Sequence, residues 1–467
     1  MALIASVSST VEFGLINGGH VGLVFGWLIP SIFVMTVALS LAELTSSMPT
    51  SAGLCYFSSK LAPPEYAPLA SWITGWANIT GQICLMCSID FNCAQMITSA
   101  ITVASDGATH LSSGATYGIL LVILFSHGII CSAATSILAR LNLVYVCVNG
   151  ISEPTAVGTT LAAIIALLVI SENKVSTKDA FTLFENHSGW ENNGWAFILS
   201  FTAPMWCLTG YDSAAHISEE TAGASKTAPT AILASRFLGW ILLIVISFVI
   251  PSTAKILDTE LPLPMAQVLL DVLGKRGMLV IWSFTTVVQY FAGAAQGVDA
   301  SRAIFAFARN NALPGSKWWK AINSHTQTPV NAVWLVMAAS GICGLLGFSA
   351  AVLTSLSGAS VIGLYTSYAT PIFLRITSGR HRFVPGPFNL GPCSIPVGTI
   401  AVAWVSFIVV VLFFPPGQVP TAQEMNYAVV LIMSVFILSS TSWVISAHKW
   451  FRGPIGNINE LEKNSSP

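Results

Sequence analysis

Several carboxylic acids of this chain lie inside long apolar stretches, where a charge is costly and therefore indicates a function. A carboxylate shielded from water can bind and release a proton, and Glu12 and Asp90 are the leading candidates for that chemistry. Asp299 stands three residues before Arg302, so an ion pair within one helix is the alternative there. The acids in this setting are Glu12, Glu43, Asp90, Glu153, Asp212 and Asp299.

Two apolar stretches, 2–17 and 200–217, are interrupted by small and polar residues. A break in a membrane helix exposes backbone N–H and C=O groups that lipid cannot satisfy, so breaks survive where they line a cavity and hold a solute. In the first stretch, Ser8, Ser9 and Thr10 predict an unwound turn whose free N–H groups could hold a carboxylate. Close helix packing through small residues is the alternative.

The second stretch has its own cause for unwinding. Pro204 removes a helix hydrogen bond and Gly210 tolerates unusual dihedral angles. The face of Trp206 could attract an ammonium group, with packing as the competing interpretation. The binding candidates here are Trp206, Thr209, Gly210 and Tyr211, joined by Trp76 and Tyr290 from other stretches. We interpret His127 as a satisfied packing histidine.

The composition excludes a soluble protein. Of 467 residues, 54% are hydrophobic and 8% are charged, against about 25% charged in a soluble domain. The net charge of -1 predicts no nucleic-acid partner.

We find no soluble catalytic domain and no clustered Ser/His or His/Asp set, so we predict neither an enzyme nor a cofactor. The nine cysteines are scattered, mostly in apolar segments, and predict no metal site.

Runs of about 20 apolar residues fit a bilayer, and twelve are predicted. They cover 1–16, 21–45, 68–99, 115–138, 143–171, 195–217, 233–253, 279–305, 329–348, 350–376, 395–415 and 425–447. The loops between them divide the 19 basic residues into fourteen and five, which places both termini in the cytosol. We therefore expect a membrane domain over 1–448 and a short cytosolic tail over 449–467. The sequon at Asn186 lies in a predicted outer loop and could carry a glycan.

Four runs in order along the chain carry a family resemblance. They are Gly18–Trp27 with Ala42–Gly53, Gly210–Asp212 with His216–Glu220, Ser301–Pro314, and Pro385–Gly391 with Met425–Tyr427. Together they resemble the amino acid–polyamine–organocation superfamily, specifically its fungal branch of amino acid, GABA and choline permeases. The resemblance implies an all-α, leucine-transporter-like core of two five-helix inverted repeats, roughly 1–171 and 195–376, plus two peripheral helices. Glu43 and Asp212 match acidic positions of the family motifs, which makes them coupling candidates, and Trp206 matches an aromatic that closes over substrate.

The resemblance also implies a function. We expect alternating-access import of an amino acid or small amine, with protons as the coupling ion, in the plasma membrane or alternatively a vacuolar or other organelle membrane. A quaternary ammonium such as choline is bound by a cage of aromatic rings, whereas GABA or an α-amino acid needs a site that binds its carboxylate. The chain starts only a few residues before the expected first break, so much of the inner half of that helix is absent. A transport-inactive solute sensor or a non-functional truncated permease is therefore the alternative.

Overall fold

The computed structural model describes the chain except residues 1–2, 49, 51–52, 211–223, 350 and 455–467, and it leaves the side chains of 134–156 and 224–236 undescribed. All regular structure in the described part is helical. The main helices are α1 (Leu3–Ser47), α2 (Gly53–Leu61), α3 (Ala67–Ala104), α4 (Ser113–Ile170), α9 (Ala224–Val249), α11 (Pro264–Arg309), α13 (Val330–Cys343), α14 (Val352–Ile376), α15 (Ser394–Val411) and α16 (Ala428–Ser442). The short ones are α5 (Thr177–Thr182), α6 (Asn193–Leu199), α7 (Thr202–Cys207), α10 (Thr253–Leu257), α12 (Ser316–Trp319), η1 (Gly344–Phe348), η2 (Gly391–Cys393), η3 (Trp443–Ala447) and α17 (His448–Trp450).

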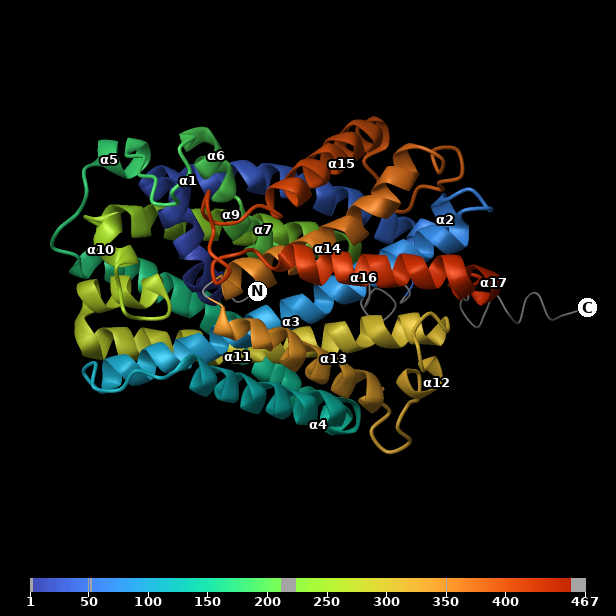
Figure 1. Cartoon of the computed structure of the whole chain (residues 1–467), viewed down its shortest axis with the longest axis horizontal. Helices are drawn as coiled ribbons and strands as arrows, with labels where there is room; N and C mark the ends of the chain where they lie inside the picture. Colours follow the sequence, from blue (N-terminus) through green and yellow to red (C-terminus); the bar gives the residue numbers. More distant parts are fainter. Residues whose placement is uncertain (1–2, 49, 51–52, 211–223, 350, 455–467) are drawn as a thin grey trace, which may run out of the picture.

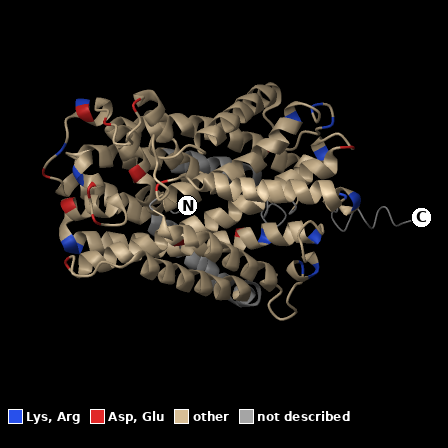
Figure 2. Cartoon of the chain, in the orientation of Figure 1, with Lys and Arg blue, Asp and Glu red and all other residues tan. Residues whose placement is uncertain are grey.

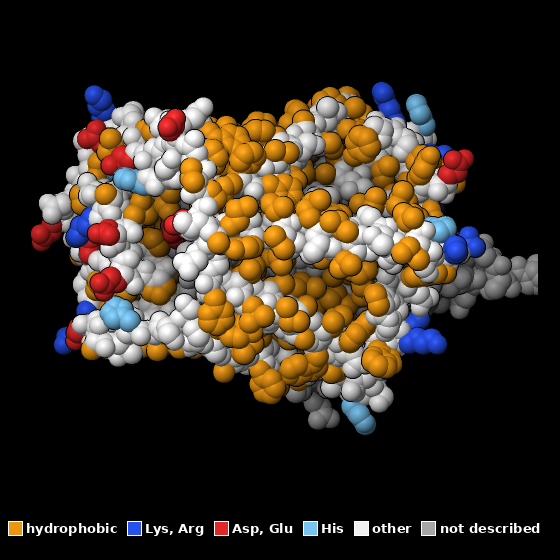
Figure 3. Space-filling view, in the orientation of Figure 1, with side chains coloured by type: hydrophobic (Ala, Val, Ile, Leu, Met, Phe, Trp, Pro, Cys, Tyr) orange, Lys and Arg blue, Asp and Glu red, His pale blue; other side chains and the backbone are white. Residues whose placement is uncertain are grey.

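The long helices run along the long axis of the molecule (Figure 1). The Lys, Arg, Asp and Glu residues gather toward the two ends of that axis, as the colouring of Figure 2 shows. Between the ends, the face seen in Figure 3 is a broad belt of hydrophobic side chains. Among the described residues, seven helices are long and apolar enough to cross a bilayer. The prediction of an integral membrane protein agrees with this belt.

The two predicted spans 1–16 and 21–45 are two helices that meet at Gly19 inside α1. Gly19 has φ 57° and ψ -132°, a conformation that favours glycine. The chain folds back so tightly that a Cβ on Gly22 would overlap the carbonyl oxygen of Gly14. Small residues at these positions therefore let the two halves of α1 pack closely.

The unwound turn predicted over Ser8, Ser9 and Thr10 is wrong. The backbone is helical from Leu3 to Gly18. Ser9 Oγ donates to Ala5 O at 2.9 Å, and Thr10 Oγ1 donates to Ser6 O at 3.0 Å. Serine and threonine hydroxyls can bond the carbonyl four residues back without ending the helix, which is what happens here.

The predicted break between Pro204 and Gly210 is present, displaced toward Gly210. α6 ends at Leu199 and α7 follows it after a short turn. Pro204 is the third residue of α7, within the first turn, where its missing N–H removes no helix bond. α7 ends at Cys207, and Gly210 has φ 92°. The described residues that follow α7, 208–210, are therefore unwound.

α3 is the central helix of the bundle. It packs against α2, α4, α11, α14 and α16, whereas α1 packs against α7, α9 and α15. The predicted spans from 279 onward correspond to α11, α13 with η1, α14, α15 and α16 with η3, and α4 covers the two predicted spans 115–138 and 143–171. The all-helical class is confirmed. The inverted relationship between 1–171 and 195–376 stays a prediction.

Candidate functional site

The first helix of α1 lies directly against the end of α7. Thr10 Oγ1 and Cys207 Sγ are 3.2 Å apart, within hydrogen-bonding distance for sulfur. Cys207 is the last residue of α7, so this contact stands immediately before the unwound residues 208–210. The two interrupted apolar stretches, far apart along the chain, thus meet at one place.

Trp206 belongs to α7, and its side chain points toward α3. Its side chain is buried, and its indole Nε1 donates to Ser88 Oγ at 3.0 Å. Ser88 in turn donates to Leu85 O, so both groups have partners. Thr209 Oγ1 donates to the carbonyl oxygen of Met205, which closes the last turn of α7. Trp206 therefore has a fixed orientation at the edge of the break.

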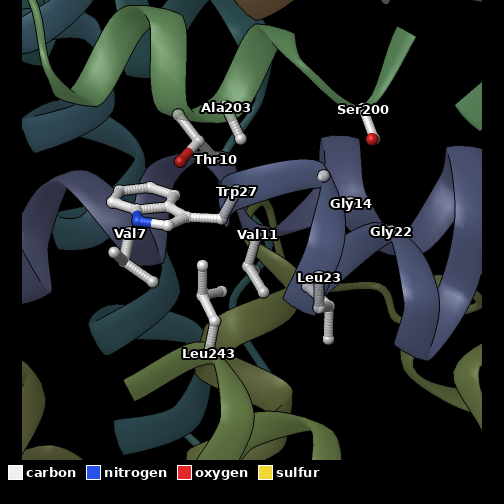
Figure 4. Close-up of a pocket in the computed structure, with 11 residues that line it drawn as sticks. Val7, Thr10, Val11, Gly14, Gly22, Leu23, Trp27, Ser200, Ala203 and Leu243 are labelled. Carbon is white, nitrogen blue, oxygen red and sulfur yellow. The ribbon is translucent and has the colours of Figure 1, made fainter. Parts of the chain in front are cut away.

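A small pocket separates the two halves of α1. Figure 4 shows it lined by Val7, Thr10 and Val11 from the first half, by Leu23 and Trp27 from the second, and also by Gly14, Gly22, Ser200, Ala203 and Leu243. Gly26 completes the lining. Its volume is at most about 230 Å³, below the roughly 300–1,000 Å³ of typical small-molecule sites. The lining is mostly apolar. We therefore assign this pocket to helix packing rather than to the binding of a solute.

Ser8 and Glu12 lie on the side of α1 opposite Thr10. With 100° per residue, each is about 160° around the helix from Thr10, whereas Ser8 is only about 60° from Val11, which lines the pocket. Ser8 Oγ is buried and has no hydrogen-bond partner among the described residues. Glu12 is half-buried, one helical turn beyond it. A buried hydroxyl without a partner and a carboxyl group thus share one face of the helix.

Trp76 does not belong to this site. It is twelve residues before Ser88 on α3, which corresponds to about 18 Å along the helix. Its ring packs instead 5.8 Å from Trp72 and 5.9 Å from Phe307, as measured between ring centroids. Trp76 therefore does not join Trp206 in the described structure, and Tyr211 lies outside it.

Tyr290 lies in a different cluster, where α3, α4 and α11 meet. Its ring centroid is 4.5 Å from that of His127, and its hydroxyl is 2.8 Å from Ser126 Oγ. His127 Nδ1 is 3.0 Å from Asp90 Oδ2, and both side chains are 0% exposed. His127 is therefore the partner of a buried carboxyl group, a role that our interpretation as a packing histidine missed.

Glu43 anchors a loop at the end of the bundle. Its Oε1 accepts from Leu390 N at 3.0 Å, and its Oε2 accepts from Ser394 Oγ at 2.6 Å. Ser394 is the first residue of α15, so the carboxylate stands at a helix N-terminus, where negative charge is favourable. This geometry indicates a structural role. Asp212 and Tyr211 lie outside the described residues.

Two further predicted residues have local partners. Asp299 Oδ2 accepts from Gln82 Nε2 at 3.2 Å, which connects α11 to α3. Asn186 Nδ2 donates to Trp190 O at 2.7 Å and to Asn193 Oδ1 at 3.0 Å. Asn186 therefore uses both amide hydrogens to brace its own loop, a geometry that does not favour a glycan on this nitrogen.

The comparison with known families decides the identity. A family model described as amino acid permease matches residues 1–436. The chain belongs to the amino acid permease family. This permease is thus an integral membrane transport protein and not an enzyme, as predicted.

Individual relatives agree with the family assignment. The permease is 34% identical to the amino-acid permease BAT1 homolog of Oryza sativa subsp. japonica, over 98% of this chain and 90% of the rice protein. It is 34% identical to the amino-acid permease BAT1 of Arabidopsis thaliana, over 98% and 91% of the two chains. It is 33% identical to the GABA-specific permease of Saccharomyces cerevisiae, over 98% and 81%. These relatives come from plants and yeast, so they do not single out the fungal branch.

Proposed function

We propose that this permease imports an amino acid or a GABA-like amine by alternating access, together with a proton, across the plasma membrane or alternatively a vacuolar or other organelle membrane. The contact between Thr10 of α1 and the unwound end of α7 carries this proposal. Unwound backbone inside a membrane bundle is tolerated where it lines a solute site. Of the residues predicted on α1, Thr10 would belong to this site together with 206–211 at the break, whereas Ser8 points to the other side of the helix.

The separation of the aromatic residues bears on the substrate. A quaternary ammonium such as choline needs several rings around one point. Trp76 packs on Phe307 and Tyr290 packs on His127 rather than on Trp206. This disfavours choline and leaves a substrate that carries a carboxylate, either an α-amino acid or GABA. The yeast relative named as GABA-specific supports the same class.

Proton coupling rests on the buried acids. Glu12 and Asp90 lie within membrane-spanning helices and have no cationic Lys or Arg partner among the described residues. A carboxyl group in such a place can alternate between charged and neutral forms as the site opens to water. Glu43 and Asp212 remain coupling candidates by their motif positions, although the two hydrogen bonds of Glu43 favour an anchoring role.

Uptake in cells tests the proposal. The permease would be expressed with a fluorescent tag in a yeast strain deficient in amino acid and GABA uptake, and surface expression would be confirmed by microscopy. Radiolabelled GABA, alanine, glutamate, arginine and choline are then supplied at external pH 5 and pH 7. We expect uptake of GABA or an amino acid that is faster at pH 5 and is not inhibited by excess choline.

Two results would contradict this. Uptake of choline alone would refute the carboxylate-bearing substrate class. No uptake of any compound despite surface expression, together with thermal stabilisation of the purified protein by one of them, would favour the transport-inactive sensor.

A further inference from the structure

Asp90 on α3 and His127 on α4 form a hydrogen-bonded pair in the interior of the bundle. Their side chains are 0% exposed and are joined at 3.0 Å. Three ion pairs elsewhere in the described residues involve exposed side chains near α10, α11 and the loop after α3: His110 with Glu260, Lys255 with Asp271, and Lys275 with Asp106. The Asp90–His127 pair thus differs from them in being fully desolvated.

Each member of the pair has one polar atom without a partner. Asp90 Oδ1 and His127 Nε2 are buried and accept or donate no hydrogen bond within the described structure. A buried ion pair that serves only as a brace is stable when its remaining lone pairs and hydrogens are also satisfied. Leaving Asp90 Oδ1 and His127 Nε2 without hydrogen bonds is therefore costly. These are also the atoms at which a proton can bind and leave.

α11 covers the pair. A Cβ built on Gly293 would overlap Asp90 Oδ1 and lie 2.8 Å from His127 Cε1. Tyr290, one turn earlier on α11, packs on the imidazole and contacts Ser126 through its hydroxyl. The backbone of α11 at Gly293 thus closes the pair off from water in this conformation.

The remaining titratable groups around the pair are weakly acidic. Cys87 and Cys93 on α3 and Cys131 on α4 lie within electrostatic range of Asp90. Tyr290 is the titratable neighbour on α11. Among the described residues, no Lys or Arg interacts with this Asp90 carboxyl group. A proton gained or lost here therefore changes the charge of an otherwise neutral environment.

We infer that Asp90 and His127 together are the proton carrier of this permease, and that Gly293 is the positioning residue that closes it. In the empty carrier, neutral His127 donates Nδ1–H to the Asp90 carboxylate and the pair has net charge -1. Loading adds one proton at His127 Nε2 and makes the pair neutral, and release removes that proton again. An uncompensated charge is costly inside the closed bundle, so the loaded carrier closes more readily. This inference rests on the proton-coupled transport proposed above.

Proteoliposomes can separate coupling from substrate handling. Wild type, Asp90→Asn and His127→Gln would be reconstituted with the membrane potential clamped, and a radiolabelled substrate accepted in the cell assay would be followed. Counterflow, which exchanges labelled for unlabelled substrate without net proton movement, reports on binding and conformational cycling. Accumulation driven by a pH gradient reports on coupling. Thr285→Val is the matched control, because it removes a buried hydroxyl from α11 with little change in shape.

For one proton per neutral substrate, wild type and Thr285→Val are expected to accumulate substrate about tenfold for each pH unit of gradient. Asp90→Asn and His127→Gln are expected to retain counterflow within about twofold while the accumulation ratio falls toward about one. Gly293→Ala is expected to retain counterflow and lower the accumulation ratio, because the added methyl group pushes α11 off the pair.

Other outcomes distinguish the claim that this pair carries the proton from the claim that transport is coupled to protons at all. If both substitutions at the pair leave gradient-driven accumulation unchanged, the pair is not the carrier, although proton coupling stands. If both reduce counterflow and accumulation in parallel with thermal stability, the pair is a structural brace and the inference is wrong. If wild type itself shows counterflow but no response to the pH gradient, proton coupling fails for the whole permease.

Discussion

Trp206 Nε1 on α7 donates a hydrogen bond to Ser88 Oγ on α3, 3.0 Å away. The bond fixes the indole at the edge of the unwound residues 208–210, next to the contact of Cys207 with Thr10. A ring fixed in this way can close over a bound solute without first losing rotamer freedom.

Trp206→Ala is expected to abolish uptake, since it removes both the ring and a well-packed side chain. Trp206→Phe keeps a ring and loses the hydrogen bond, so its transport is expected to fall several-fold at a stability cost of about 1 kcal/mol. Ser88→Ala removes the same bond from the other partner and serves as the control. Radiolabelled uptake and thermal unfolding in detergent are the measurements. Equal uptake by wild type and Trp206→Ala at equal surface expression would remove this ring from the site.

Gly22→Ala is expected to destabilise the permease by about 1–3 kcal/mol, because the new methyl group meets backbone, which cannot move aside as a side chain can. The carbonyl of Gly14 occupies the space in question. Gly118→Ala on α4 is the matched control, since apart from its own helix backbone no atom lies within 4 Å of the place that its Cβ would take. We expect that variant to be neutral or slightly stabilised. Thermal unfolding monitored by fluorescence-detected gel filtration compares the two, and equal midpoints would contradict the close packing of the two halves of α1.

Glu43→Gln is expected to lower stability by about 1.5–3 kcal/mol through weakening of charge-assisted hydrogen bonds to Leu390 and Ser394. The pH gradient should still drive accumulation in the folded fraction, because Glu43 acts as an anchor. Thermal unfolding and proteoliposome uptake of the same preparation provide both readouts. If the variant melts at the wild-type temperature but no longer accumulates substrate in response to the pH gradient, Glu43 takes part in coupling.

Phe451 and Trp450 are neighbours in sequence and differ in burial, being 2% and 45% exposed. The Phe451 ring is 5.3 Å from that of Trp72 on α3. Phe451→Ala is therefore expected to cost about 3–5 kcal/mol, and Trp450→Ala considerably less. Thermal unfolding of the two variants measures the difference. Similar losses would mean that this segment behaves as the free tail that the sequence predicted over 449–467.

The sequence by itself determined the membrane class, most of the spans and the interruption between Pro204 and Gly210. These properties are local. Hydropathy over about 20 residues decides whether a segment enters a bilayer, and Gly19 and Gly210 adopt positive φ because their own lack of a Cβ allows it. The wrong prediction of an unwound turn at Ser8, Ser9 and Thr10 was also local, because a run of hydroxyl residues is compatible with a helix when hydroxyls bond the carbonyl one turn back.

Only the tertiary structure decided which polar residues meet. Asp90 and His127 are 37 residues apart and on different helices, and Glu43 reaches Leu390 across 347 residues. No spacing in the sequence connects such pairs, because the rotation and depth at which two helices pack depend on all the side chains between them. The same packing separated Trp76 and Tyr290 from Trp206 and placed Gly293 over the Asp90–His127 pair. Hydropathy therefore established that this chain crosses a membrane, whereas helix packing decided which of its buried acids has a histidine partner.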